Sequence, residues 1–132
     1  MATFNSFTEI QAWQKARELS KLIFDLTTKG TFARDFGLKD QINRATGSIM
    51  DNIAEGHGRG SKNEFVNFLS YSEGSSSETI SQLYRALDRG HIIADEFNMA
   101  YSKTEEVSKM IAGLIRYLNA SSIRGNKFKD RI

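Results

Sequence analysis

The 132-residue sequence contains no cysteine, no proline and only two histidines. Without cysteine the chain can form no disulfide and offers no thiolate to a metal ion. Without proline, no residue interrupts a helix by removing a backbone donor, so long helices are expected. No apolar run approaches the roughly 18 residues of a membrane-spanning helix, and the N-terminus lacks the basic and apolar regions of a signal peptide. These absences predict a cytoplasmic protein without membrane contact.

The composition that remains is ordinary for one folded domain, but the charge is unevenly placed. Apolar residues make up 39% of the chain and charged residues 26%, which argues against disorder. Four basic residues against Asp130 give residues 121–132 a net charge of +3. Because the whole chain carries +2, the other 120 residues carry −1. The basic character therefore belongs to the C-terminal segment.

Apolar residues recur at steps of three and four in four segments, at about residues 8–30, 38–55, 62–89 and 93–118. Thr8 with Gln11, and Ser61 with Glu64, have the spacing of capping boxes that start helices. Glycines stand where the first three segments end, and no segment alternates like a strand. We predict an all-α protein, an antiparallel up-down-up-down four-helix bundle over residues 1–120, followed by a flexible basic tail over 121–132.

Residues 51–65, here called the hinge, connect the second and third predicted helices. Gly56 is expected to take the left-handed conformation that closes the second helix. Asp51 and Glu55 lie in the last turn of that helix, where the helix dipole disfavours negative charge. We therefore expect an ion-pair clamp across the hinge, in which these carboxylates meet basic partners. The candidate partners are Arg44, Arg59 and Lys62.

Asn52, at the start of the hinge, falls on the apolar stripe of the second helix three residues after Ile49. The preferred interpretation is a buried, hydrogen-bonded amide that fixes register or association state. A ligand contact is the alternative.

Small residues in the third helix suggest a place where another helix approaches closely. These are Ser72, Gly74, Ser75 and Ser76, and Gly47 and Gly113 also fall in the middle of helices. An aromatic side chain from another helix or subunit would fill such a groove. Trp13 and Phe24, on a wide apolar face of the first helix, are the candidates for a subunit interface.

The sequence argues against catalysis and cofactors. A di-iron site in a bundle requires two Glu-x-x-His motifs and two further carboxylates, but the chain has only His57 and His91. The same shortage removes most nucleophile–base pairs. The glycine-rich stretch 56–60 lacks Walker spacing and follows a helix rather than a strand, so it reads as a turn. We expect a non-enzymatic protein with no cofactor, no metal and no small-molecule substrate.

The hinge also carries a family resemblance. Asn52-Ile-Ala-Glu-Gly56, followed by Gly58-Arg59 and Ser61-Lys62, resembles the signature of a bacterial four-helix-bundle family encoded in intervening sequences of 23S ribosomal RNA genes. The similarity covers roughly residues 7–117. It extends to Ala12-Trp13-Gln14-Lys15-Ala16, Gln41, Arg44-Ala45, Phe68-Leu69, Gly74-Ser75, Glu78 and Gly113-Leu114. Two features depart from the family pattern: Thr31-Phe32-Ala33 replaces a Phe-Pro pair, which implies a looser turn, and Gly60 replaces a second basic residue.

The family resembles, in turn, the accessory variability protein of diversity-generating retroelements, a pentameric barrel with a basic pore that assists a reverse transcriptase. The resemblance implies a ribosomal RNA-associated homo-oligomer, expected to be a pentamer, with nucleic-acid contacts and no known enzymatic activity.

The leading hypothesis is a homo-oligomeric bundle that binds RNA or DNA, or a nucleic-acid enzyme, through phosphate contacts. The alternative is an interaction scaffold that binds only protein. The expected phosphate contacts are Arg44, His57, Arg59 and Lys62, together with Arg124, Lys127, Lys129 and Arg131 of the tail.

Overall fold

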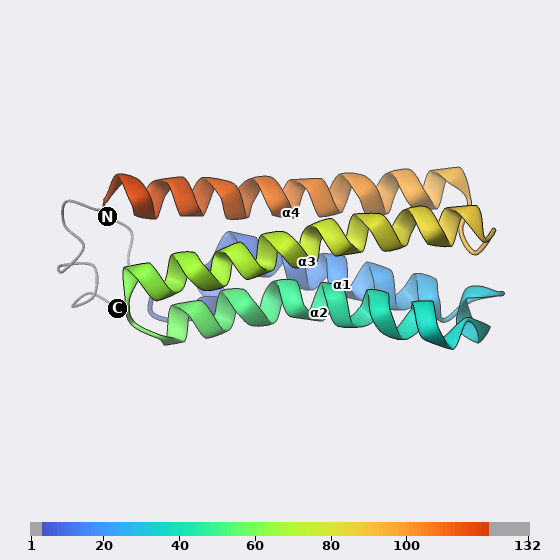
Figure 1. Ribbon diagram of the computed structural model, residues 1–132, viewed down its shortest axis with the longest axis horizontal. Helices are drawn as coiled ribbons and strands as arrows, with labels where there is room; N and C mark the ends of the chain where they lie inside the picture. The colour runs from blue at the N-terminus through green and yellow to red at the C-terminus, as the bar shows by residue number, and fades with distance from the viewer. Residues whose placement is uncertain (1–3, 122–132) are drawn as a thin grey trace.

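The computed structural model of the chain describes residues 4–121, which form four long antiparallel helices (Figure 1). The helices are α1 (Gln11–Thr27), α2 (Phe36–Gly58), α3 (Lys62–Asp88) and α4 (Ala94–Ala120). Two short 3-10 helices, η1 (Phe7–Glu9) and η2 (Phe32–Arg34), precede α1 and α2. The described residues contain no strand. The predicted all-α, up-down-up-down four-helix bundle is confirmed.

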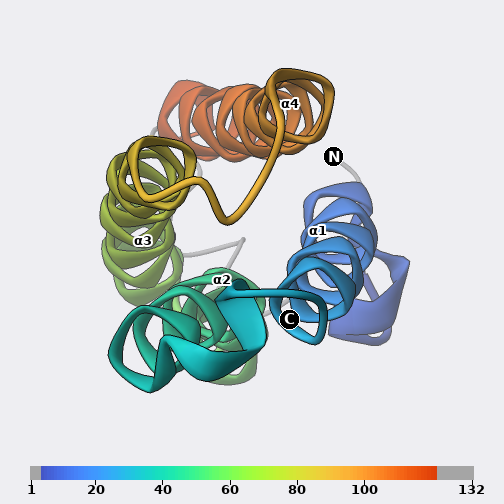
Figure 2. The ribbon, with the colours of Figure 1, turned by 90° about the vertical axis from the view of Figure 1, so that its right-hand side faces the viewer.

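Each helix packs against the next, and α4 packs back against α1, so α1 and α3 lie diagonally across the bundle (Figure 2). The hinge joins α2 to α3 at one end, where α1 also begins and α4 ends; we call this the hinge end (Figure 1). The α1–α2 and α3–α4 connections lie together at the opposite end. Residues far apart in sequence therefore meet at both ends.

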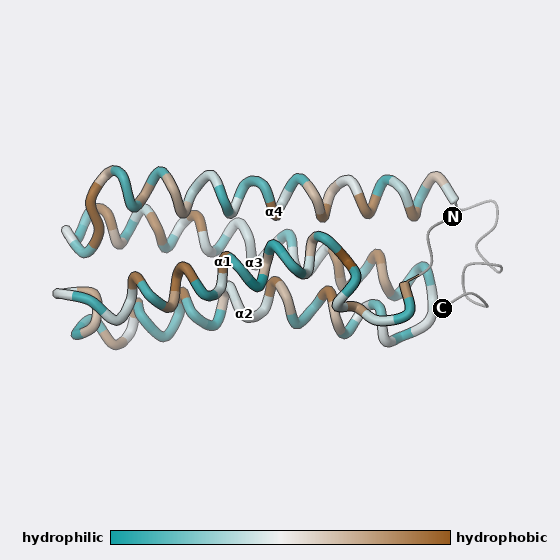
Figure 3. The backbone as a smooth tube through the Cα atoms, turned by 180° about the vertical axis from the view of Figure 1, so that it is seen from behind, coloured by the Kyte–Doolittle hydropathy of each residue, from teal (hydrophilic) through white to brown (hydrophobic). Residues whose placement is uncertain are grey.

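The core follows the predicted apolar stripes, and hydrophobic and hydrophilic positions alternate along every helix (Figure 3). Its middle is lined partly by hydroxyl groups of α3, because Ser72, Ser75, Ser76 and Thr79 are buried. Each hydroxyl donates a hydrogen bond, and Ser72 Oγ reaches across to the carbonyl oxygen of Ile49 at 2.8 Å. A buried hydroxyl is tolerated when it is bonded in this way. The helical interpretation of the serine-rich stretch is confirmed.

Both predicted capping boxes are wrong. Thr8 lies inside η1, which is capped by Ser6 through a 3.2 Å bond to the Thr8 amide, and α1 begins only at Gln11. Ser61 does precede α3, but its side chain caps no backbone amide. The S-x-x-E spacing is necessary for a capping box, yet Glu64 has a stronger partner at the hinge, described below.

Two helix ends and one expected close approach also differ from expectation. Helix α2 continues through Gly56 to Gly58, and Gly60 (φ 73°) takes the left-handed conformation instead. Ile93, assigned to the apolar stripe of the fourth helix, is exposed at its N-cap, where its amide donates to Glu96 Oε1. The expected close approach at Gly47, Gly74 and Gly113 is also wrong within one chain, because a Cβ added at the first two would meet no atom within 4 Å, and at Gly113 only Arg116 Nη2 at 3.8 Å.

Candidate functional site

Arg59 organises the hinge. Its Nε donates to Glu55 Oε2 at 3.0 Å, and its Nη1 lies 3.7 Å from Glu64 Oε1. The guanidinium carbon stands 4.9 Å from the ring centroid of Phe68. The expected ion pair is thus confirmed between Glu55 and Arg59, while Asp51 forms none within residues 4–121. The unexpected contact with Glu64 links the end of α2 to the start of α3. Arg59, which we predicted to bind phosphate, is therefore already paired within the chain.

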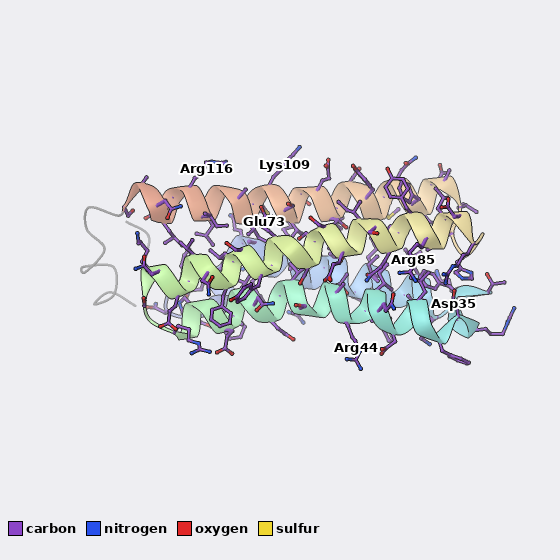
Figure 4. All side chains as sticks on the ribbon, viewed as in Figure 1. Asp35, Arg44, Glu73, Arg85, Lys109 and Arg116 are labelled. Carbon is purple, nitrogen blue, oxygen red and sulfur yellow. The ribbon has the colours of Figure 1, made fainter. Side chains whose placement is uncertain are left out.

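Arg44 does not take part in the clamp, contrary to the expectation. It projects from the middle of α2 into solvent (Figure 4), and its Nε is 2.8 Å from Asp40 Oδ2 one turn earlier. Lys62, the first residue of α3, forms no hydrogen bond or ion pair within the described part of the chain. The structure therefore does not gather Arg44, Arg59 and Lys62 into one cationic site.

His57 binds the N-terminal segment rather than facing open solvent. Its Nε2 is 3.1 Å from the carbonyl oxygen of Phe4, and its ring makes edge contacts with Phe4 and Phe65. Half-buried between α2 and the residues that precede η1, it has a structural role in this chain. The four basic tail residues Arg124, Lys127, Lys129 and Arg131 lie outside the described residues.

Asn52 is half-buried, not buried, because Ile53 takes the core position. Its Nδ2 donates to both the carbonyl and the hydroxyl oxygen of Ser48, each at 2.9 Å. Ser75 of α3 also donates to Ser48 Oγ at 2.9 Å. Asn52 therefore supports a polar link between α2 and α3, so a hydrogen-bonded structural amide is the correct interpretation, and its predicted depth is wrong.

The two predicted interface residues differ in their surroundings. Trp13 is half-buried, with Phe7 of η1 packed edge-on against it at 5.1 Å between ring centroids. Phe24 is 55% exposed. Both lie on the same side of α1, eleven residues or three turns apart. This side of α1 also carries Arg17 and Lys21, which are exposed and form no ion pair with any carboxylate of residues 4–121.

A polar groove between α2 and α3 was not predicted as a site. Its lining is Gln41, Arg44, Ala45, Ser48, Glu78 and Gln82. Four of these residues belong to the motifs that carry the family resemblance, although they come from separate stretches of sequence. Arg85 borders the groove (Figure 4) and donates from Nη1 to Gln41 Oε1 at 2.9 Å. Helical periodicity shows only that such residues face solvent. That they line one groove follows from the packing of α2 on α3, which the sequence does not give.

Another unpredicted cluster lies at the end opposite the hinge. Asp35, the N-cap of α2, accepts hydrogen bonds at Oδ2 from His91 Nε2 and Arg89 Nη1, each at 2.8 Å. His91 Nδ1 is 2.8 Å from Thr31 Oγ1, and its ring stacks on Phe32. The cluster ties the α1–α2 connection to the α3–α4 connection. The missing Phe-Pro pair implied a looser turn between α1 and α2. These contacts instead hold that turn in place.

This cluster makes the stability of the fold depend on pH in the acid range. The His91 hydrogen bond, followed by that of Arg89, lowers the pKa of Asp35 from 3.8 to about 2. A carboxylate with a lowered pKa stabilises the fold fully above about pH 4, and the contribution is lost as pH falls toward 2. We expect Asp35→Asn to unfold with a shallower pH dependence than wild type between pH 4 and 2, measured by urea denaturation. Asparagine keeps the N-cap acceptor, so equal slopes for the two proteins would contradict the assignment.

The described residues contain no group of three or more histidine, aspartate or glutamate side chains arranged to hold a metal ion. None of the helices within residues 4–121 is both long enough and apolar enough to cross a bilayer. Thr31, His91 and Asp35 form a hydroxyl–imidazole–carboxylate chain, but Arg89 shares the carboxylate oxygen and the ring is stacked against Phe32. That arrangement braces two loops.

The fold and its surfaces define a class of protein: an antiparallel four-helix bundle whose polar residues brace helix connections and line an interhelical groove. The model of the 23S rRNA-intervening sequence protein family matches residues 8–113, and the chain belongs to that family. A solved structure of a protein of unknown function from the S23 ribosomal protein family of Bacteroides thetaiotaomicron VPI-5482 is similar, with a TM-score of 0.72 and 21% identity. The alignment covers 79% of this chain and 97% of that one, and shows a shared fold. No curated protein matches the sequence.

Proposed function

We propose that this chain acts as a non-enzymatic, self-associating helical bundle. The observation that carries the proposal is the solvent-facing side of α1, where Phe24 remains 55% exposed and the half-buried ring of Trp13 lies three turns away on the same side. A large apolar side chain on a rigid helix gains stability when a second molecule covers it. The resemblance to a pentameric relative supports a closed ring, and five is the expected number of subunits.

Light scattering after size-exclusion chromatography tests self-association. We expect one species with a mass several times the 14.9 kDa of a single chain, and Phe24→Ser should shift it toward smaller masses. Phe36→Ser, which alters a still more exposed ring in the first turn of α2, is the matched control and should leave the mass unchanged. A wild-type protein that stays monomeric at high concentration would refute the proposal.

Charge segregation favours a second part of this function, nucleic-acid binding through the C-terminal segment. Residues 4–121 sum to −1, and the hinge cation Arg59 is engaged by two carboxylates, whereas residues 122–132 carry +3. In a ring the basic segments of several copies act together, and binding releases counterions from the phosphates. Lys62, free of intramolecular partners at the hinge, is the described residue that contributes.

Filter binding at increasing salt tests this part. We expect retention of RNA or DNA at low salt that falls steeply as salt rises, and about a tenfold or greater loss when the tail cations are neutralised. The tail variant replaces Arg124, Lys127, Lys129 and Arg131 with glutamine. The control variant replaces Lys29, Arg34, Lys109 and Arg116 with glutamine, so that the two variants have the same net charge. If the two variants bind alike, the tail has no special role, and if wild type retains neither nucleic acid, the bundle is a protein-only scaffold.

A further inference from the structure

An apolar groove lies at the hinge end, between the start of α1 and the last turns of α4. Helix α1 begins only at Gln11, and the preceding η1 packs mainly against α1 and α2, so the last turns of α4 are less covered on their α1 side. Two half-buried side chains of α4, Met110 and Leu114, line the groove there. The groove has a volume of about 400 Å³, and its full lining is Phe4, Glu9, Ile10, Gln11, Ala12, Met110 and Leu114.

The edge of this groove is negatively charged. Glu9 belongs to its lining, and Glu106 lies one turn before Met110 on the same side of α4, in an adjoining depression that also contains Met110. Neither carboxylate forms an ion pair with a cation of residues 4–121. Since exposed ion pairs contribute little, an apolar side chain is the main determinant of binding here, and flanking cations add to it.

The chain itself contains a segment of this kind. Residues 122–132 follow Ser121, which lies at the same end of the bundle as the groove (Figure 1), and they place Phe128 between two lysines. An extended chain spans roughly 3.3 Å per residue, so the seven residues from Ser121 to Phe128 reach about 23 Å. Leu114 and Met110 lie only about 10 Å and 16 Å back along α4 at the helical rise. Phe128 is therefore within reach of the groove.

We propose that Phe128 docks into this groove of its own chain, with Lys127 and Lys129 beside Glu9 and Glu106. Docking on the same chain is favoured because few residues join the two partners, which gives a high effective concentration. The docked lysines meet carboxylates, so fewer cations of the tail are available to phosphate. The consequence rests on the nucleic-acid binding proposed above: RNA or DNA competes with the groove for the tail, and docking lowers the affinity of the chain for nucleic acid.

Engineered cysteines test the docking without nucleic acid, since the chain has no cysteine of its own. Asn126→Cys keeps Phe128 and every cation of the tail, and Gln11→Cys places the second thiol at the exposed rim of the groove. Under mild oxidation this pair should form an intrachain disulfide about tenfold or more faster than Asn126→Cys paired with Arg116→Cys. Arg116 is the matched control because it is nearer the end of α4 but points away from the bundle (Figure 4).

Adding Phe128→Ser to the first cysteine pair should slow its disulfide to the rate of the control pair. Equal rates for the two pairs, or no effect of Phe128→Ser, would show that the tail does not dock through this ring. A disulfide that forms as readily between separate Asn126→Cys and Gln11→Cys chains would show that the groove receives the tail of another copy. Each of these results overturns the proposal.

Filter binding tests the competition. Phe128→Ser frees the tail without changing its charge, so its affinity for RNA or DNA should rise about threefold or more. The control is Ile123→Ser, which removes an apolar side chain too near Ser121 to reach Met110 and should leave affinity unchanged. An equal or lower affinity of Phe128→Ser than of wild type overturns the competition. If wild type binds neither nucleic acid, the competition fails together with the proposed nucleic-acid binding, while the disulfide rates still decide the docking.

Discussion

Replacing Phe32 with alanine is expected to lower the free energy of unfolding by about 3–5 kcal/mol, the usual effect of removing a fully buried aromatic ring. Phe32 belongs to η2, a single turn in the α1–α2 connection, yet its side chain is completely buried. The ring stacks on His91 at 5.1 Å between centroids. Its loss would leave a cavity and also remove one wall of the Asp35–His91 hydrogen-bond cluster.

Phe36→Ala is the matched control, because the same ring four residues later is 75% exposed. We expect that substitution to change stability by no more than about 0.5 kcal/mol. Both variants should be compared by urea denaturation followed by far-ultraviolet circular dichroism. Similar midpoints for Phe32→Ala and wild type would show that the connection is not part of the core.

The second large effect is expected at Gly56, where Gly56→Ala should destabilise the fold by about 1–3 kcal/mol through overpacking. A Cβ at this position would lie 2.8 Å from Phe68 Cβ and 3.1 Å from Phe65 Cδ1, so α3 would have to move away from α2. Helix propensity alone predicts the opposite sign, since alanine is favoured over glycine by about 1 kcal/mol in a helix. The two effects are therefore separable.

Gly47→Ala measures the propensity effect by itself. Gly47 lies in the same helix, and an added Cβ there would contact nothing within 4 Å. We expect this variant to gain about 0.5–1 kcal/mol, in contrast to the loss at Gly56. Stabilisation of both variants in thermal unfolding would disprove a close approach of the helices at Gly56.

The hinge shows why the sequence motifs were enough to identify the family but not to predict every contact. Glu55 and Arg59 were recognisable as partners, because an ion pair between residues four apart on a helix follows from spacing. The capping box at Ser61 was a reasonable alternative for Glu64, but the guanidinium of Arg59 lies near it. Two local patterns competed for one carboxylate, and their distances in space favoured the ion pair.

Gly56 and Gly60 show a similar limit. Either glycine can adopt a left-handed conformation, so the sequence does not say which one ends the helix. Gly60 adopts it, with φ of 73°, while Gly56 remains helical, and Phe65 and Phe68 leave no room for a side chain beside it. The reason for a glycine at position 56 is the packing of α3, which no spacing rule contains.

The sequence by itself determined the number of helices, their antiparallel order and most of the core, because steps of three and four place apolar side chains on one face whatever the partner is. It also identified the family through short motifs. Only the tertiary structure decided which polar residues meet. Asp35 with His91, and Glu78 with Gln82 and Arg44, are brought together by two helix connections and by the packing of α2 on α3. Such contacts depend on rotation and translation between helices, and helical periodicity describes each helix alone.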